Sequence, residues 1–177
     1  KGQDVPIRLI SVRRGAGFSS GGTILFDEAV LRRPKLDSQT TMSVAEGVAK
    51  TWLGGSVSVN GDGGGAIREG LSRYLATQFI ESKFGKEVAD VERLRQRVAY
   101  AAVVLRDQPI NTVSPLDDYY YAVVANKAAM LWRLLAIKTG ADSFGSRITA
   151  SIQDGNVTLA EIRAAFPEQK EFLDYGF

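Results

Sequence analysis

Two neighbouring segments have the clearest helical pattern in the chain: residues 44–54 read VAEGVAKTWLG, and residues 68–75 read REGLSRYL. The first lies on a stripe of apolar side chains spaced three or four residues apart: Met42, Ala45, Ala49, Trp52 and Leu53. In the second, apolar side chains recur every four residues: Ile67, Leu71, Leu75 and Phe79. Glycine follows both stripes, and glycine commonly ends a helix. The sequence therefore predicts two helices, over residues 37–53 and 67–84.

The flanking sequence predicts strands on one side and a further helix on the other. Residues 5–12 alternate apolar and polar side chains, and residues 22–26 are a second β-prone run, so both fit one small sheet. Residues 88–105 contain an apolar helical stripe: Val88, Val91, Leu94, Val98, Ala101 and Leu105. We expect this stripe to face the core. The charged side chains of the same helix are expected to face solvent: Glu87, Glu92, Arg93 and Arg97.

Four more helices are predicted in the C-terminal part, with starts at Ser114-Pro115, Ala141, Thr158 and Pro167. The first of these is expected to run through Lys138 and to end at Gly140. Thr158 and Glu161 have the spacing of a capping box. The tyrosines at 119–121 are expected to divide between core and surface, and Trp52 and Trp132, which lie at helical spacings, are expected in the core.

The composition excludes several classes of site. The chain has 177 residues, 45% of them hydrophobic and 24% charged, which is typical of a folded globular domain. It contains no His and no Cys. A Ser-His-Asp triad, a thiolate nucleophile, a disulfide and a histidine-ligated metal are therefore all excluded.

Charge and hydropathy indicate a soluble domain that does not bind nucleic acid and has no membrane-spanning segment. The net charge is +2, and the basic residues lack the density and the interleaved aromatic residues of a nucleic-acid groove. No apolar run approaches the roughly 20 residues that a membrane span needs. The chain begins without a signal peptide, so we expect a fragment of a longer protein whose targeting segment lies elsewhere. The compartment is left open.

Together, the two helical segments resemble the active-site helix pair of the aminopeptidase N-like zinc metallopeptidases. In that family the first helix reads Val-Ala-His-Glu-x-Ala-His-Gln-Trp-Phe-Gly. The second contains Asn-Glu-Gly-Phe-Ala-x-Tyr-Leu, with its Glu 19 residues after the second His. Here the separation between Lys50 and Glu69 is also 19 residues. The other positions that match in this register are Trp52, Gly54, Gly70, Tyr74 and Leu75.

The resemblance implies a zinc site that has been altered in this chain. The family's two His ligands fall on Glu46 and Lys50, and its general-base Glu falls on Gly47. Only the third ligand, Glu69, is retained. A protonated Lys cannot ligate zinc, and two carboxylates do not make the usual three-ligand site. Although the family implies zinc, we therefore expect no metal and no other cofactor at these positions.

The resemblance continues on both sides of the helix pair. Residues 15–26 look like the family's Gly-Ala-Met-Glu-Asn-Pro-Gly strand with one residue inserted, and they lack the carboxylate that grips a substrate's amino terminus. Residues 125–131 look like the family's Tyr-Glu-Lys-Gly-Ala helix start. There the Tyr that stabilises the transition state is replaced by Ala125, while Lys127 is retained. This joint loss of ligands, base and Tyr predicts an inactive domain.

Glu46 and Lys50 have two interpretations. As an i, i+4 pair, they would form an ordinary exposed ion pair worth about 0.3–0.5 kcal/mol. If the second helix packs as in the family, the Lys50 ammonium lies instead between Glu46 and Glu69, within about 4 Å of the Glu69 carboxylate. The residual cleft would then be lined by Glu46, Lys50, Glu69, Arg73 and Lys127.

The glycine run at residues 61–66, GDGGGA, also matches a Gly-x-Gly-x-x-Ala nucleotide loop. The β-prone run before it is only four residues long, and no βαβ unit follows. Nucleotide binding is therefore only a minor alternative. We expect the glycines to form a flexible or a reshaped wall beside the former cleft.

These patterns and the resemblance together predict an α+β, thermolysin-like domain over residues 1–177. Its parts are a strand-containing segment at 1–34, the former active-site helix pair at 35–85 and a helical lobe at 86–177. The expected function is that of an inactive pseudopeptidase, which acts as a scaffold or as a peptide- or protein-binding module beside other domains of a longer protein. The alternative is a peptidase or hydrolase that uses Glu46 and Glu69, or groups from another chain.

Overall fold

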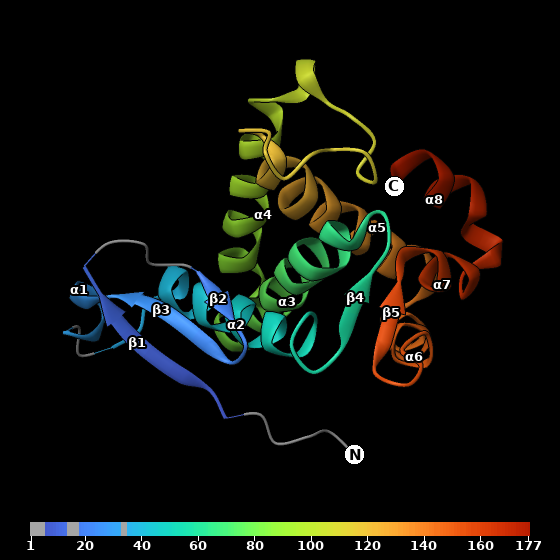
Figure 1. Cartoon of the computed structure of the whole chain (residues 1–177). Helices are drawn as coiled ribbons and strands as arrows, with labels where there is room; N and C mark the ends of the chain where they lie inside the picture. The colour runs from blue at the N-terminus through green and yellow to red at the C-terminus, as the bar shows by residue number, and fades with distance from the viewer. Residues whose placement is uncertain (1–5, 14–17, 33–34) are drawn as a thin grey trace.

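The computed structural model describes residues 6–13, 18–32 and 35–177 of an α+β protein (Figure 1). A three-stranded sheet lies at the N-terminal end, with strand order β1-β3-β2. Strand β1 (Arg8–Val12) runs parallel to β3 (Thr23–Asp27), and β2 (Ser19–Ser20) runs antiparallel to β3. Two predicted strands therefore pair as expected. Residues 15–17 of the strand that resembles the peptidase family lie outside the described residues.

The predicted helix pair is confirmed. After the short helix α1 (Glu28–Leu31), helix α2 (Ser38–Trp52) begins at Asp37, whose carboxylate accepts the Thr40 N–H at 2.7 Å. The second helix opens with a π-helical turn, η1 (Ala66–Leu71), and continues as α3 (Ser72–Phe84). It ends where Gly85 has φ +92°, a conformation that favours glycine.

The apolar stripe of α2 is buried only in part. Met42 and Leu53 are buried, but Trp52 is 37% exposed, so its expected place in the core is wrong. Leu53 lies just beyond the last helical residue and has an extended backbone, so its side chain does not follow the helical stripe that contains Trp52. Leu53 takes the inner position, beside the buried Val57.

Helix α4 (Lys86–Ala101) buries a different face from the one predicted, although Glu87 and Arg97 are exposed as expected. Its apolar residues Val91, Leu94 and Val98 are exposed, whereas its polar residues are buried: Glu92, Arg93 and Gln96. The neighbouring helix α3 supplies the reason, since it presents polar partners at this interface. Gln96 donates to the Thr77 hydroxyl at 2.9 Å, and Arg93 pairs with Glu81. The 3-10 turn η2 (Val104–Arg106) follows α4, with Leu105 almost fully exposed.

The next helix begins later than predicted. It consists of the π-helical turn η3 (Ala122–Lys127) and α5 (Ala128–Thr139), so the segment after Ser114 is a turn. Local side-chain bonds stabilise that turn, because Asp117 accepts the Ser114 N–H and the Ser114 hydroxyl accepts the Leu116 N–H.

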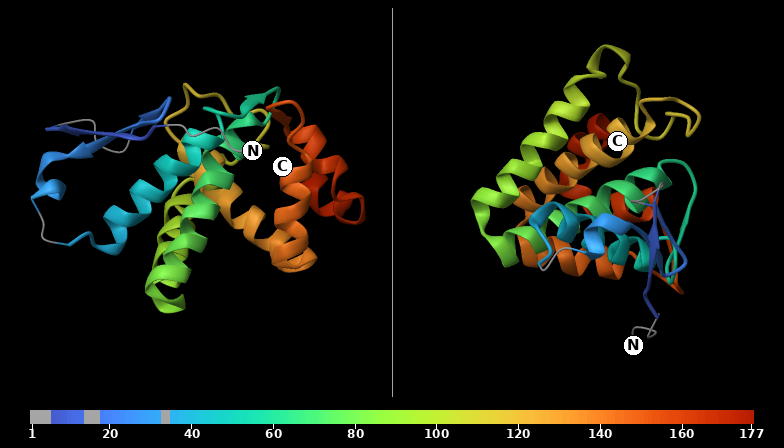
Figure 2. Two further views of the ribbon diagram at one scale, coloured as in Figure 1. Left: turned by 90° about the horizontal axis from the view of Figure 1, so that it is seen from below. Right: turned by 90° about the vertical axis from the view of Figure 1, so that its left-hand side faces the viewer.

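The C-terminal elements surround the end of α5. They are α6 (Ala141–Ala150), β5 (Asn156–Thr158), α7 (Leu159–Ala164), the 3-10 turn η4 (Pro167–Gln169) and α8 (Lys170–Gly176). The predicted capping box of Thr158 and Glu161 is present at the start of α7. Strand β5 pairs in parallel with β4 (Ser58–Asn60), which connects the helix pair to the C-terminal part (Figure 2).

The main core is centred on Trp132 of α5. Its ring is fully buried, lies 4.5 Å from the ring of Phe177, and donates its indole N–H to the carbonyl of Ala66 at 2.8 Å. The second predicted core Trp is therefore confirmed. Within the described part of the chain, no helix is long and apolar enough to cross a membrane.

Two apolar truncations test the orientation of α4. Leu94→Ala is expected to lower the free energy of unfolding by less than about 0.5 kcal/mol, because Leu94 is 51% exposed. Ile80→Ala, at a fully buried position of α3, is expected to cost about 2–5 kcal/mol. Urea unfolding followed by circular dichroism measures both. A loss of about 2 kcal/mol or more for Leu94→Ala would place the apolar stripe in the core.

Candidate functional site

Lys50 lies between two carboxylates that come from adjacent helices. Its Nζ is 2.8 Å from Oε1 of Glu46, one turn earlier on α2, and 2.6 Å from Oε2 of Glu69 in η1. The predicted contact with Glu69 is confirmed. Among the described residues, Glu69 Oε2 accepts no other hydrogen bond, so the Lys50 ammonium is its close partner. The second oxygen of Glu69 lies 3.7 Å from Nε of Arg68.

Arg73 completes the arrangement and connects it to a third helix. Its Nε and Nη2 donate to the two carboxylate oxygens of Glu46 at 3.0 and 3.1 Å, a bidentate geometry. Its Nη1 donates to Oδ1 of Asn126 in η3 at 2.6 Å. We call Glu46, Lys50, Glu69 and Arg73 the buried ion cluster. With Asn126, the cluster links α2 to the helices that begin with η1 and η3.

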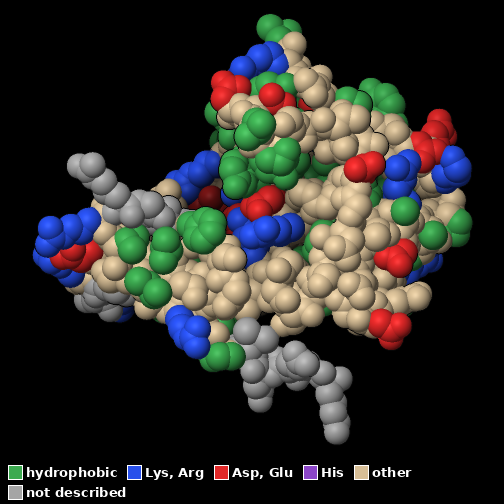
Figure 3. All heavy atoms as spheres, in the orientation of Figure 1, with side chains coloured by type: hydrophobic (Ala, Val, Ile, Leu, Met, Phe, Trp, Pro, Cys, Tyr) green, Lys and Arg blue, Asp and Glu red, His purple; other side chains and the backbone are tan. Residues whose placement is uncertain are grey.

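The cluster is almost closed to solvent. The side chains of Glu46 and Lys50 are each 12% exposed and that of Glu69 is 10% exposed. In the space-filling view, acidic and basic side chains meet in the middle of the visible face, beside the N-terminal sheet (Figure 3). The interpretation of Glu46 and Lys50 as an exposed surface pair is therefore wrong. At this burial, each charge depends on its partners.

Burial and neighbouring charges have opposite effects on the pKa values of Glu46 and Lys50, at the centre of the buried ion cluster. Burial by itself raises the pKa of the Glu46 carboxyl, but the positive charges of Arg73 and Lys50 outweigh it, so the pKa lies below its ordinary 4.5. Burial by itself lowers the pKa of the Lys50 ammonium, but the carboxylates of Glu46 and Glu69 outweigh it, so the pKa lies above its ordinary 10.5. Both groups are charged at neutral pH.

The position that corresponds to the general base is sterically closed. A Cβ added to Gly47 would lie 2.8 Å from Cδ1 and 2.9 Å from Cγ1 of Ile24, a buried residue of β3. Strand β3 therefore packs directly against α2 at this glycine. A larger residue here would have to displace a core side chain.

Ala125 and Lys127, the two positions of the resemblance in the third helix, lie in different environments. Ala125 is fully buried and presents only a methyl group. Lys127 is not brought to the buried ion cluster: its Nζ pairs with Asp107 at 2.7 Å and lies 5.8 Å from the centre of the Tyr100 ring. The residue that reaches the cluster is Asn126, which the sequence analysis missed. An uncharged amide gives no charge pattern from which to predict this contact.

The glycine run is packed rather than flexible, which corrects the expectation of a mobile wall. A Cβ on Gly65 would lie 2.5 Å from the hydroxyl oxygen of Tyr120, and one on Gly63 would lie 2.5 Å from Leu159. These two side chains therefore fill the space beside the glycines. Burial raises the pKa of the Tyr120 hydroxyl, and the negative charge of Glu69 adds to this, so Tyr120 lies in the electrostatic field of the cluster.

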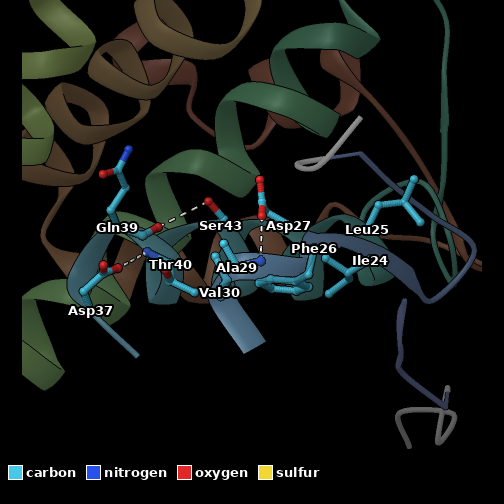
Figure 4. Close-up of a pocket in the computed structure, with 10 residues that line it drawn as sticks. All are labelled: Ile24, Leu25, Phe26, Asp27, Ala29, Val30, Asp37, Gln39, Thr40 and Ser43. Carbon is cyan, nitrogen blue, oxygen red and sulfur yellow. Dashed lines mark hydrogen bonds between the residues drawn. The ribbon is translucent and has the colours of Figure 1, made fainter. Parts of the chain in front are cut away.

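A separate pocket of about 290 Å³ lies between β3 and the starts of α1 and α2 (Figure 4). Its polar groups have structural partners: Asp27 accepts the Ala29 N–H and Asp37 accepts the Thr40 N–H, both at 2.7 Å. These carboxylates cap the two helices. The two acidic side chains of the pocket therefore have a structural role at the helix starts.

The donor set of the buried ion cluster does not fit a zinc ion. An ammonium stands between the two carboxylates, and it is held there as a cation by both of them. Within the described ranges, no group of three or more Asp or Glu side chains is arranged to hold a metal ion.

Comparison with known proteins finds no matching family model, no matching curated protein and no matching solved structure. The relationship to the aminopeptidase N-like family therefore depends on the motif positions in the sequence.

The dependence of the cluster on Lys50 is tested by Lys50→Met. This change leaves Glu46 and Glu69 buried without their shared cation, so we expect a loss of about 3–5 kcal/mol in the free energy of unfolding. Lys86→Met is the matched control, since Lys86 forms an exposed i, i+4 pair with Asp90 at 2.6 Å and should cost less than about 1 kcal/mol. Equal losses for the two variants in urea unfolding would show that Lys50 is not a buried cation.

The same cluster predicts how stability depends on pH. Because the folded pKa of Glu46 is lowered, its contribution is present above pH 4.5 and is lost as the pH falls through the lowered value. Because the folded pKa of Lys50 is raised, its contribution is present below pH 10.5 and is lost as the pH rises through the raised value. Urea unfolding from pH 3 to pH 11 measures the stability difference between wild type and Lys50→Met, which should be largest in the alkaline range below pH 10.5. The difference should shrink above that pH, as Lys50 loses its proton, and toward acid pH, where the buried carboxylates left unpaired in the variant take up protons more readily. A difference that grows as the pH falls would contradict these assignments.

Proposed function

We propose that this chain is a catalytically inactive domain of the aminopeptidase N-like type, with a thermolysin-like architecture, in which an internal ammonium takes the place of the metal. The observation that carries the proposal is the position of Lys50, within 2.8 Å of both Glu46 and Glu69. In the register of the resemblance, Glu69 is the retained zinc ligand. Here its cationic partner is the Lys50 ammonium of the same chain, in place of a metal ion.

The surroundings of Lys50 support an inactive site. A peptidase of this type needs an open position beside the metal, a base and a donor for the transition state. Here the base position, Gly47, is covered by Ile24, and the donor position holds the buried methyl group of Ala125. Each of these positions lacks its function for a separate reason, so a single reverting substitution would not restore the reaction.

The packing favours a scaffold over a peptide-binding cleft. The buried ion cluster joins three helices through side chains that are fully used in contacts with each other. Ile24 fills the space above Gly47 that a bound peptide would need. The exposed apolar side chains of α4, Val91, Leu94 and Val98, favour contact with another domain of a longer protein.

The alternative function, hydrolysis by the carboxylates alone, has weaker support. A carboxylate pair needs one protonated member and one ionised member to act as acid and base. Glu46 is held ionised by Arg73 and Lys50, and Glu69 faces the same ammonium. Both carboxyl side chains are also largely buried, at 12% and 10% exposure, which restricts access for a substrate and water.

Metal content tests the proposal. After exposure to zinc and desalting, the wild-type chain is expected to retain no stoichiometric zinc, because the Lys50 ammonium occupies the position of a ligand. The double variant Glu46→His/Lys50→His should retain about one zinc per chain, since it places two imidazoles one turn apart and facing Glu69. Elemental analysis measures both, with circular dichroism to show that the variant is folded.

The outcomes separate the two parts of the proposal. One zinc bound per chain in the wild type would contradict the proposal that the site is inactive. A folded double variant without zinc would overturn the register that relates this chain to the peptidase family.

Activity provides a second test. Wild-type protein is expected to hydrolyse no aminoacyl anilide above the background rate, with or without added zinc. Hydrolysis that is abolished by Glu46→Gln or by Glu69→Gln, but not by the surface change Glu171→Gln, would favour the carboxylate hydrolase instead.

A further inference from the structure

A second charged pocket lies between α4 and α5, on elements that pack against each other. It has a volume of about 530 Å³. Three arginines line it: Arg93 and Arg97 from α4, and Arg133 from α5. The aliphatic side chains of Met130 and Leu134 form part of the same wall. None of these residues belongs to the buried ion cluster, so this pocket stands independently of the proposed function.

The guanidinium of Arg93 is held in place by two carboxylates, while its Nε has no partner among the described residues. Its Nη1 donates to Asp90 at 2.7 Å and its Nη2 pairs with Glu81. The side chain is 9% exposed, and its buried Nε has no hydrogen-bond acceptor in the described part of the chain. An unsatisfied buried donor is costly, and it is uncommon in folded proteins.

The other two arginines add positive charge that no acidic residue balances. No carboxylate among the described residues pairs with Arg97 or Arg133, although both line the pocket. Three guanidiniums therefore face two carboxylates, Asp90 and Glu81, and both of these are bound to Arg93. The pocket therefore has an excess of positive charge, which Arg97 and Arg133 supply.

We propose that this pocket binds a small organic phosphate. A phosphate group has acceptor oxygens for the planar guanidinium donors of Arg97 and Arg133, whereas the Nε of Arg93 is covered by protein. Met130 and Leu134 offer a surface for the apolar part of such a ligand. The volume exceeds what a phosphate group alone would fill, which favours an organic ligand over a simple inorganic ion.

The experiment uses phenyl phosphate as the probe, with inorganic phosphate and phenol as separate comparisons. Calorimetry measures the affinities, and the arginine Nε–Hε signals of the ¹⁵N-labelled protein show which side chains respond. We expect saturable binding of phenyl phosphate that moves the Arg97 and Arg133 signals, and weaker binding of either comparison compound. Mapping on the wild-type protein needs no variant and therefore does not depend on the folding of one.

A pair of double variants isolates the pocket from general surface charge. Arg97→Gln/Arg133→Gln removes two lining charges and is expected to weaken binding at least about tenfold, because each bond to a charged group contributes substantially. Arg8→Gln/Lys138→Gln removes the same net charge at exposed positions on β1 and at the end of α5, and should leave the affinity within about twofold. Circular dichroism confirms that both are folded.

Several results would overturn the proposal. Equal weakening in the two double variants would assign the effect to surface charge. Shifts that do not saturate, or that leave the Arg97 and Arg133 signals unmoved, would show that no anion binds in this pocket. If phenol bound as tightly as phenyl phosphate, the phosphate group would not contribute to binding. If inorganic phosphate bound as tightly as phenyl phosphate, Met130 and Leu134 would not contribute to binding.

Discussion

The salt bridges of Lys50 are the interaction on which the arrangement of the helices depends. A buried carboxylate is stable only when it is paired, and Glu69 has its closest partner in an ammonium from a different helix. Removal of any one charge would leave another buried and uncompensated, so the four charged residues act as a unit. Arg73 extends this constraint to Asn126, so the third helix must also stand at a fixed distance. The cluster thus specifies how three helices lie relative to one another.

Small residues make that arrangement possible. A Cβ on Gly70 would collide with Ala128 and with the backbone of Val124, so the helices that contain Glu69 and Asn126 approach closely at this point. Gly47 allows the same close approach between α2 and β3. Larger side chains at these positions would separate the elements and lengthen the ion pairs. The glycines of the helix pair therefore have a packing role that does not require catalysis.

Local signals in the sequence predict much of the fold, and contacts between elements account for the errors. Periodicity and glycine stops predict the helix pair, and Thr158 with Glu161 predicts the start of α7. The Lys50–Glu69 contact follows from a spacing of 19 residues combined with a family resemblance. Periodicity also separates the two faces of α4, but only the partners on α3, such as Glu81, determine which face is buried. Strand β5 is too short to have a pattern of its own, and it forms because β4 lies beside it.

The two charged sites differ in their balance of charge, and this difference separates a structural role from a binding role. In the buried ion cluster, two carboxylates face two basic side chains, and all four have short contacts. Such a site needs nothing from outside and offers little to a ligand. Between α4 and α5, the carboxylates of Asp90 and Glu81 are taken up by Arg93, while Arg97 and Arg133 have no acidic partner in the described part of the chain. An added anion stabilises positive charge that has no acidic partner, so we expect ligand binding at this second site and a structural role for the first.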